Sequence, residues 1–345
     1  MKKIVNNTLL VKQSNIELIR GVLREQKSST RVNLAKDTGL SLATCGNILV
    51  EMVKRGEVIE AEMEESSGGR PARCYQYNEN YSLIMSLVII ADGTKKILKY
   101  EVTNLFYEQV ETDTIEYDYI IFDTINDVIA KTLQVYSGIK AIGIGVPGVT
   151  TVDGDVVTCD ITEMENMKLR SRLAEIYDKK IVVENLTHAT AYGFFNQRAD
   201  KAETEYFAVL IAPHGYNLGT GIIIGDEILR GSNRLAGEVS LIPKEISRAQ
   251  MLEEAKTDRA KLIEIVVDSI VSIIAIVNPS VLVLTGSAIT KDMVSGILEK
   301  CSEKIADIFL PIIEYKEDYF MGYLIGIRML TMRVLDNSVI LIRRQ

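Results

Sequence analysis

The sequence has few cysteines, and their spacing excludes the sites that cysteines usually build. The four are far apart and include no C-x-x-C pair: Cys45, Cys74, Cys159 and Cys301. This spacing predicts neither a zinc site nor a disulfide framework. Because disulfides are rare where thiols are kept reduced, a reducing compartment is the simplest setting. We therefore expect a cytoplasmic protein without a structural metal.

Long apolar runs are also missing. The most apolar segment, residues 262–277, contains Glu264 and Asp268 and is shorter than the roughly 20 residues that span a bilayer. It predicts a buried helix. The N-terminus holds only a very short apolar run, and no small-residue cleavage site follows it. We therefore expect no signal peptide and no membrane contact.

Charge is distributed unevenly along the chain, whose net charge is −8. Residues 1–75 carry twelve Lys/Arg and nine Asp/Glu, whereas the rest carries twenty-seven and thirty-eight. A mildly basic head on an acidic body fits a module that contacts phosphates, attached to a body that does not touch DNA. The 345 residues, 47% apolar and 25% charged, are typical of a soluble globular protein of two or three domains.

The stretch from Ser28 to Ala72 has the pattern of a winged helix-turn-helix. It predicts a short helix over residues 30–38, a turn at Gly39, and a second helix over residues 42–55 that begins after an N-cap at Ser41. One side of the second helix is apolar and can pack on its neighbours: Cys45, Ile48, Leu49 and Met52. Its small polar side is free to read base edges.

Flanking segments complete this module. Apolar spacing predicts a support helix over residues 14–26, and residues 57–65 and 73–77 read as wing strands joined by a loop that contains Gly-Gly-Arg-Pro. The glycines of that loop allow close backbone approach, and its arginine has the reach for an A·T-rich minor groove. We expect DNA contacts from Arg31, Ser41, Leu42, Thr44, Asn47, Lys54, Gly69 and Arg70. The alternatives are a winged helix used for protein contacts and a wing loop that serves only as an interdomain hinge.

The remaining sequence predicts two similar halves. Each has three antiparallel strands followed by alternating helices and strands, a layout typical of the actin-like, ribonuclease-H-like ATPase fold. We expect strands over residues 83–90, 97–103, 106–112, 140–145, 180–184, 206–212, 221–225, 227–229 and 281–285 and near 311, and helices over residues 119–136, 169–177, 187–197, 248–256, 259–277, 291–306 and 320–335. Two such lobes leave a cleft where a nucleotide and a small substrate meet.

This α/β fold class implies three domains. We expect a winged helix-turn-helix over residues 1–78, an N-terminal lobe over 79–200 and a C-terminal lobe that also dimerises over 201–345. The C-terminal helix, within residues 320–345, is expected to pack back on the N-terminal lobe.

Several short motifs together resemble the ROK family (repressors, open reading frames, kinases), and the resemblance extends over nearly the whole chain. They follow the family's order: residues 66–71, 145–148, 183–185, 229–233, 236–238 and 278–281 running into Gly286. The match is to the repressor branch, in which a winged helix precedes a sugar-kinase-like body. For kinases of this family the resemblance implies sugar phosphorylation by ATP, with an Asp base, Gly-rich phosphate turns and Mg²⁺.

The residues that this chemistry needs are altered. Where the family reads E-N-D-A-N, this chain has Glu184 to His188, so Leu186 stands at the position of the catalytic Asp and cannot accept a proton. His188 as a rescuing base is an alternative, but a hydrogen-bonded structural histidine is the better interpretation. In the first phosphate turn the family's leading Asp is Ile90, and Asp92 replaces a glycine with a charge that repels phosphate. The second turn keeps Gly215, Gly219 and Gly221, which serve equally well to permit tight turns.

The zinc and sugar elements are reduced too. The family's G-E-x-G-H ends here in Leu241, and residues 242–251 hold no Cys or His, so no metal site is expected. The resemblance leaves Gly148, Asn185 and Glu238 as candidate effector-binding residues; the alternative is that Asn185 and Glu238 are retained for packing.

These observations favour a non-enzymatic regulator, expected to repress carbohydrate-related genes. It would bind a double-stranded operator with an inverted repeat as a homodimer or tetramer, take a sugar or sugar phosphate as effector, and need no cofactor. Leu42 stands where family members commonly carry Lys or Arg, so DNA affinity is expected to depend on dimerisation. The alternatives are an active ATP-dependent ROK sugar kinase and a DNA-binding scaffold that responds to no ligand.

Overall fold

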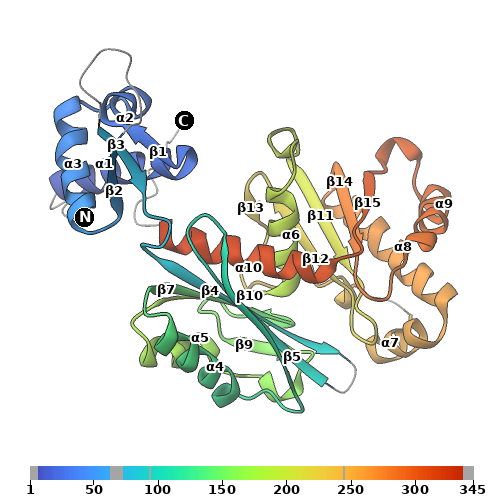
Figure 1. Cartoon of the computed structure of the whole chain (residues 1–345). Coiled ribbons are helices and arrows are strands. Elements are labelled where there is room, and N and C mark those ends of the chain that lie inside the picture. Colours follow the sequence, from blue (N-terminus) through green and yellow to red (C-terminus); the bar gives the residue numbers. More distant parts are fainter. Residues whose placement is uncertain (1–6, 63–72, 93–94, 244, 337–345) are drawn as a thin grey trace.

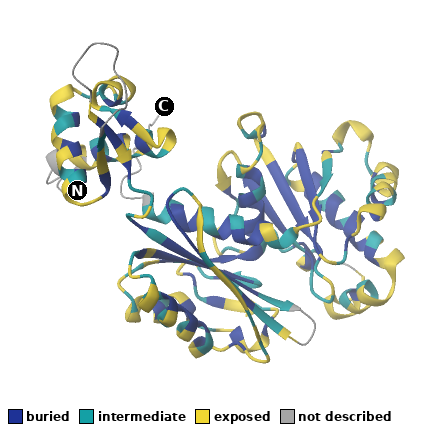
Figure 2. Cartoon of the chain, in the orientation of Figure 1, coloured by how far each residue is buried: buried dark blue, intermediate teal, exposed yellow. Residues whose placement is uncertain are grey.

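The computed structural model describes residues 7–62, 73–92, 95–243 and 245–336. An N-terminal head joins a body made of two α/β lobes (Figure 1). Buried residues concentrate in the two large sheets and in the helices between them, as Figure 2 shows. No helix among the described residues is long and apolar enough to cross a membrane.

The head consists of a helical triad on a small antiparallel sheet in the order β1-β3-β2. The helices are α1 (Asn7–Gln26), α2 (Arg31–Thr38) and α3 (Leu42–Lys54); the strands are β1 (Ser28–Thr30), β2 (Val58–Glu62) and β3 (Arg73–Tyr77). This is the arrangement expected of a winged helix. The wing loop, with Gly69 and Arg70, lies outside the described residues.

Local chemistry fixes the turn between α2 and α3. Gly39 ends α2 in the left-handed region at φ 71°, which glycine adopts without steric cost. The Ser41 hydroxyl then accepts a hydrogen bond from the backbone N–H of Thr44, 3.1 Å away, and caps α3. The predicted N-cap is confirmed, as is the apolar face: Cys45, Ile48, Leu49 and Met52 are buried.

Two predictions for the head were incomplete. Helix α1 begins at Asn7 rather than at residue 14, and its added turns carry Lys12, which forms an ion pair of 2.7 Å with Glu51 of α3. Strand β1 was not predicted, because three residues are too few to show an alternating pattern; it is recruited by pairing with β3.

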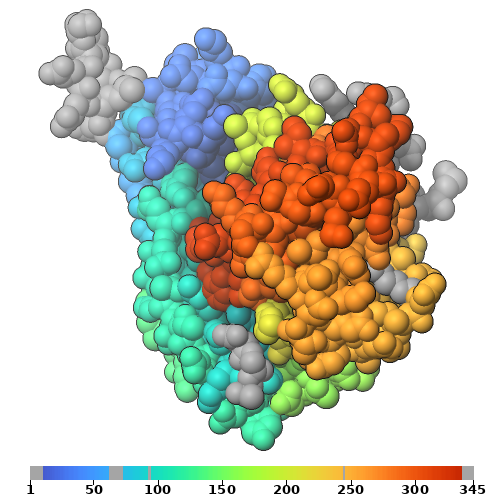
Figure 3. Space-filling model, turned by 90° about the vertical axis from the view of Figure 1, so that its right-hand side faces the viewer, coloured from blue at the N-terminus to red at the C-terminus, as the bar shows by residue number. Residues whose placement is uncertain are grey.

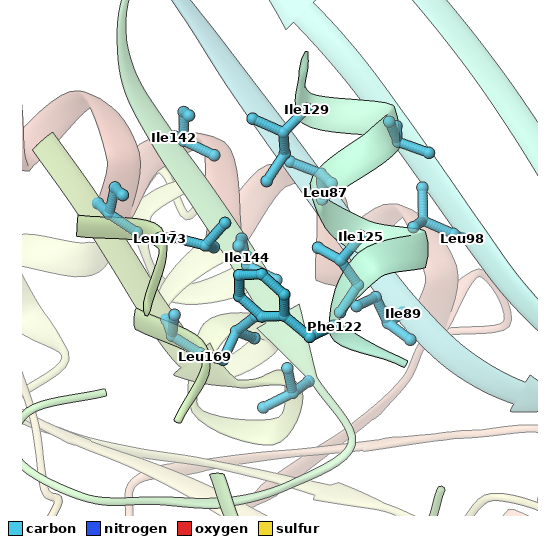
Figure 4. Packing of buried hydrophobic residues seen from close by; sticks show 14 of the residues in the cluster. Leu87, Ile89, Leu98, Phe122, Ile125, Ile129, Ile142, Ile144, Leu169 and Leu173 are labelled. Carbon is cyan, nitrogen blue, oxygen red and sulfur yellow. The ribbon is translucent and has the colours of Figure 1, made fainter. Parts of the chain in front are cut away.

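Lobe I holds a mixed sheet in the order β10-β7-β4-β5-β6. Its strands are β4 (Leu83–Asp92), β5 (Lys95–Thr103), β6 (Gln109–Tyr117), β7 (Ile139–Val146) and β10 (Lys180–Asn185), with α4 (Phe122–Val135) and α5 (Leu169–Ile176) on one face and a hairpin of β8 (Gly148–Thr150) and β9 (Val156–Cys159). Alternate residues of β4 serve different faces: Leu87 and Ile89 pack with α4 and α5, as Figure 4 shows, and Val88 packs on the opposite side.

Lobe II holds a second sheet in the order β13-β12-β11-β14-β15. The elements are β11 (Tyr206–Ile211), β12 (Gly219–Ile224), β13 (Glu227–Ile228), β14 (Val281–Thr285) and β15 (Ile312–Tyr315), covered on one face by α7 (Arg248–Thr257), α8 (Arg259–Ile276) and α9 (Val294–Lys304). Helix α8 is the buried helix predicted from residues 262–277. Its two acidic residues lie at the surface, where Glu264 pairs with Lys261 and Asp268 with Lys304.

Two helices fill the space between the sheets: α6 (Leu186–Asn196) and α10 (Tyr319–Asp336). Figure 1 shows α10 running from the head, across lobe I, to lobe II. The domain boundaries drawn from the sequence stay a prediction.

Several predicted boundaries in the body were wrong by a few residues. Strand β6 begins at Gln109 instead of residue 106, because the Asn104 side chain accepts the backbone N–H groups of Phe106 and Glu108 and closes a turn there. Helix α4 begins three residues late, at Phe122, and a 3-10 turn precedes α9 at Lys291–Met293. The hairpin of β8 and β9 is not among the predicted strands.

Candidate functional site

The exposed side of α3 is the first candidate surface. Arg31, Ser41, Leu42, Asn47 and Lys54 are exposed around it, and 49% of the Leu42 surface is accessible. The structure therefore leaves five of the sequence-predicted DNA contacts accessible on the head.

Thr44 differs from the other predicted contacts. It is half-buried, and its hydroxyl lies 2.9 Å from that of Ser41, so it belongs to the helix cap. Nothing here tests the DNA-binding role of these residues, and it stays a prediction.

Gly46 creates room on the same helix for Arg31. A side chain added at Gly46 would lie 3.4 Å from the Arg31 guanidinium and 3.5 Å from its Cδ. The arginine therefore lies against the bare backbone of α3, with its charge next to the exposed polar side.

An internal ion pair holds the helices of the head to the wing. Glu57 precedes β2 and is 1% exposed, and Arg20 of α1 donates to its Oε1 at 2.5 Å. The sequence analysis did not find this pair, because the spacing of 37 residues leaves no local pattern. A buried pair of this kind is costly to break from one side, so it orients α1 on the sheet.

The second candidate is a cavity of about 860 Å³ between the lobes. Small-molecule sites commonly have volumes of about 300–1,000 Å³. Three sequence-predicted effector residues line it together: Gly148 from β8, Asn185 from the end of β10 and Glu238 from lobe II. Figure 3 shows the packing of lobe I, in teal, against the orange and red segments of lobe II and α10.

Asn185 has both of the roles considered for it. Its side-chain oxygen accepts the backbone N–H of Thr187 at 2.7 Å and caps α6, which is a structural task. The amide nitrogen of the same side chain is left for a partner in the cavity. The structural and the ligand-binding interpretations are therefore compatible.

Charged groups that the sequence analysis missed lie beside Glu238. Asp160, directly after β9, and Arg248, the first residue of α7, both line the cavity. Burial by surrounding protein raises the pKa of Asp160 to about 7, the charge of Glu238 adds to this, and Arg248 opposes it. Burial also raises the pKa of Glu238, against the charges of Arg248 and His188. These groups come from separate segments, and only the sequence motif around Glu238 signalled any of them.

Behind the cavity a buried charge cluster joins the two lobes. Glu184 of β10 is 1% exposed and accepts hydrogen bonds from Arg230 at 2.7 and 2.8 Å and from Arg234, both in the lobe II loop after β13. Burial alone would raise the pKa of Glu184, but the hydrogen bond with His188 and the charges of His188, Arg230 and Arg234 lower it to about 2. The carboxylate is therefore fully ionised and locks lobe I to lobe II.

His188 is a structural histidine, as the sequence analysis preferred. Its Nδ1 lies 3.2 Å from Glu184 Oε1 and its Nε2 lies 3.1 Å from the carbonyl oxygen of Ala236. The ring is 3% exposed, and both nitrogens are occupied by these acceptors. It is not placed to take a proton from a ligand.

Leu186 combines cavity lining with core packing. It is 3% exposed and belongs to the apolar cluster between the lobes, where it packs into the space left by the missing side chain of Gly145, next to Ile327 of α10. The side chain has no group that titrates or accepts a proton.

The two Gly-rich turns also face the cavity. Ile90 and Ala91 line it at the end of β4, while Gly93 and Thr94 lie outside the described residues. In the second turn Gly215 has φ 82° and faces Lys256 of α7.

Gly219 and Gly221 have a packing role. Side chains at these positions would meet Thr187 and Ala191 of α6 within 2.8 Å, so these glycines let β12 approach that helix. The tight-turn explanation therefore holds for Gly215 and not for these two.

Among the described residues, no group of three or more His, Cys, Asp or Glu side chains is arranged to hold a metal ion. Where the family motif has histidine, Leu241 is exposed at 49%. The segment that follows leads into α7, whose Arg248 and Lys256 reach the cavity.

Comparison with known proteins shows what the chain is similar to. The sequence model of the ROK family matches residues 92–244. The chain is 30% identical over 243 residues to a xylose repressor of Caldicellulosiruptor bescii and 26% identical over 233 residues to a xylose repressor of Bacillus subtilis. These matches cover 68% and 66% of the chain and 60% of each relative, so the chain matches about three fifths of their length.

Solved structures agree on the fold. A ROK family transcriptional regulator, a homologue of the Mlc protein of Escherichia coli, superposes with a TM-score of 0.68 at 17% identity, over 94% of this chain and 98% of that one. A ROK family glucokinase from Streptomyces griseus, solved with glucose and AMPPNP, covers 73% of this chain and all of its own, with a TM-score of 0.54 at 16% identity. The fold is thus a head on an actin-like body, and residues 92–244 of that body match the sequence model of the ROK family.

Proposed function

We propose that this protein is a sequence-specific DNA-binding repressor of carbohydrate-related genes. Its body is a non-catalytic sugar-kinase-like sensor that binds a sugar or sugar phosphate. The observation that carries the proposal is the combination, in one chain, of an exposed helix-turn-helix face with a lobe cavity in which Leu186 stands at the position of the family's base. The repressor names of the relatives support the same assignment.

In this proposal the head contacts DNA through separate groups of residues. Asn47 reads a base edge, the exposed Leu42 meets a thymine methyl group, and Arg31 and Lys54 contact phosphates. Ser41 and Thr44 support the start of α3, and Gly69 and Arg70 of the wing enter the minor groove. Two heads of a cytoplasmic homodimer, or of a dimer of dimers, read an inverted repeat.

The cavity takes the effector. Asn185 offers its amide nitrogen, Glu238 and Asp160 offer acceptors, and Gly148 lies in the cavity wall, where its missing side chain lets β8 approach the backbone of Thr158 in β9. Binding changes the angle between the lobes and thereby the spacing of the two heads, which is how a small ligand alters operator affinity.

Fluorescence anisotropy with the DNA upstream of the protein's own gene and with random DNA of equal length tests the DNA-binding part. Asn47→Ala should lose about 10- to 100-fold on the specific fragment and little on random DNA, because a base contact carries about 1–3 kcal/mol. Lys54→Ala should weaken both and lower the slope of log K against log salt by about one. Lys300→Ala, an exposed lysine on α9, is the control. A wild-type protein without preference over random DNA at physiological salt overturns the proposal.

The kinase and scaffold alternatives have their own tests. The chain is 23% identical over 135 residues to a relative named N-acetyl-D-glucosamine kinase, so kinase activity is worth a direct assay. ATP consumption should stay at background with D-xylose, D-glucose and N-acetyl-D-glucosamine; turnover contradicts the non-enzyme assignment. A rise in Tm with one of these sugars, or with its phosphate ester, separates a sensor from a ligand-independent scaffold.

A further inference from the structure

Helix α10 extends from the cavity to an apolar cluster that the head shares with lobe I. Tyr319 and Tyr323, in its first turns, line the cavity. Met332, near its other end, is 5% exposed and belongs to an apolar cluster that joins residues of the head, such as Tyr77, to residues of lobe I, such as Ile84, with Leu335 packed against the same cluster. At about 1.5 Å per residue, Tyr323 and Met332 are about 13 Å apart along one helix.

The helix is held so closely that it moves as a unit with its supports. Gly322 and Gly326 let it approach α6: a side chain at Gly326 would lie 1.8 Å from the carbonyl oxygen of Ala189. Arg328 donates two hydrogen bonds of 2.6 Å to Glu101 of β5, whose side chain is 2% exposed. A helix with such contacts transmits a displacement and does not absorb it by bending.

The far end of α10 is fixed on lobe I. The Lys180 ammonium group donates to the backbone carbonyl oxygens of Val334 at 2.9 Å and Leu335 at 3.2 Å, which satisfies carbonyls that lack partners in the last turn. The end of α10 that lies in the cluster shared by the head and lobe I is therefore ordered by its own contacts.

Tyr323 has an unfilled hydrogen-bonding requirement. Its ring is 6% exposed and packs edge-on against Tyr319 at 5.6 Å and Phe320 at 6.2 Å. Among the described residues, no group is recorded in a hydrogen bond with its hydroxyl. Burial, together with the nearby Tyr319 and Asp160, raises the pKa of this hydroxyl, so it stays a neutral donor. Buried tyrosine hydroxyls usually have a partner, and here the open side is the cavity.

We propose that Tyr323 is a ligand-binding residue: its hydroxyl hydrogen-bonds a hydroxyl group of a sugar in the cavity, and α10 transmits the resulting displacement to the head through Met332. This rests on the proposed function, because it takes the cavity to be the effector site. It names the residue that detects the sugar and the element that links the sugar to DNA affinity.

The binding half is tested by titration calorimetry of the full chain with D-xylose, D-glucose and N-acetyl-D-glucosamine. Tyr323→Phe keeps the ring and removes the hydroxyl. It should raise the Kd of whichever sugar binds the wild-type protein about tenfold, which is the effect of one lost hydrogen bond. Tyr119→Phe, at a site that is 70% exposed, is the matched control and should bind as wild type does. Equal affinity of Tyr323→Phe and wild type overturns the ligand-binding role.

The transmission half is tested by measuring the ratio of DNA Kd values with and without the bound sugar. Met332→Ala should keep the sugar Kd within about threefold and reduce that ratio at least threefold, while Met332→Leu, which conserves volume, should retain it. Met321→Ala, on the same helix but 43% exposed, is the control. If the ratio of DNA Kd values with and without sugar is as large in Met332→Ala as in wild type, the role of α10 is overturned.

Hydrogen exchange of the unmutated chain covers the case in which Met332→Ala does not fold. Sugar binding should change amide exchange at the C-terminal end of α10 and in α1 to α3, and exchange that is unchanged in both overturns the transmission. If none of the three sugars binds wild type, the sensor part of the proposed function fails, and this inference fails with it. If one of the sugars binds wild type and Tyr323→Phe binds it with the same affinity, only this inference fails.

Discussion

Replacing Gly326 by alanine should force α10 away from α6. The added Cβ would lie 1.8 Å from the carbonyl oxygen of Ala189 and 2.3 Å from its carbonyl carbon, both backbone atoms of α6. An ordinary contact between such atoms is about 3.5 Å, so one helix must retreat by more than 1 Å. Because no flexible side chain can yield, we expect a cost of about 3 kcal/mol, at the upper end for overpacked cores.

Gly296 is the matched control for this substitution. It lies within α9, and nothing is found within 4 Å of the position that a Cβ would occupy. Alanine there meets no obstacle and has the better helix propensity, so Gly296→Ala should stabilise the protein by up to about 1 kcal/mol. The same chemical change therefore has opposite signs at the two sites.

Urea denaturation followed by far-UV circular dichroism measures both variants. The midpoint of Gly326→Ala should fall and that of Gly296→Ala should rise slightly relative to wild type. The decisive result is the order of the midpoints. If Gly326→Ala is as stable as wild type, the close crossing of α6 and α10 is not the constraint that we infer.

Three further substitutions test the site and the head. Glu184→Gln should destabilise by about 3 kcal/mol at pH 7, because two half-buried arginines lose a charge partner that is 1% exposed. The folded-state pKa of Glu184 is lowered to about 2, so its stabilisation is present above the unfolded pKa of about 4.3 and lost as pH falls through 2; the gap between variant and wild type should close on acidification from pH 5, and a constant gap contradicts this. Leu186→Asp should lower the urea midpoint, and more at pH 8 than at pH 5, because an ionised carboxylate then replaces a side chain that is 3% exposed. The same variant should not phosphorylate sugars, and turnover in a coupled ATP assay would refute this expectation. Gly46→Ala should slow amide exchange in α3 by up to about fivefold, because alanine favours the helix by up to about 1 kcal/mol more than glycine. The new Cβ would make only ordinary contacts with Arg31, at 3.4 and 3.5 Å. Faster exchange would show that Arg31 cannot adjust.

The helix-turn-helix was predictable because its determinants are local. The N-cap at Ser41, the stop at Gly39 and the buried side of α3 each depend on residues within a few positions of one another. Long apolar strands such as β4 were predictable for the same reason. The boundaries that were wrong have two kinds of cause. The added turns of α1 carry Lys12, whose partner Glu51 is distant in sequence, whereas the start of β6 depends on a local turn closed by the Asn104 side chain.

The cavity was predictable only where a contiguous motif marks it. Gly148, Asn185 and Glu238 each lie in such a motif, and the structure brings them together. Asp160 and Arg248 have no motif. They became neighbours of Glu238 only because the turn after β9 and the start of α7 meet at the same cavity wall.

By itself the sequence determined the helix-turn-helix, the α/β body, and the absence of a titratable group at Leu186, because periodicity, caps and short motifs are properties of neighbouring residues. The tertiary structure alone decided that Glu184 joins the lobes and that Tyr323 faces the cavity. It also decided that one helix extends from this cavity to the apolar cluster shared by the head and lobe I, since those relations depend on contacts between segments that are not neighbours in the sequence.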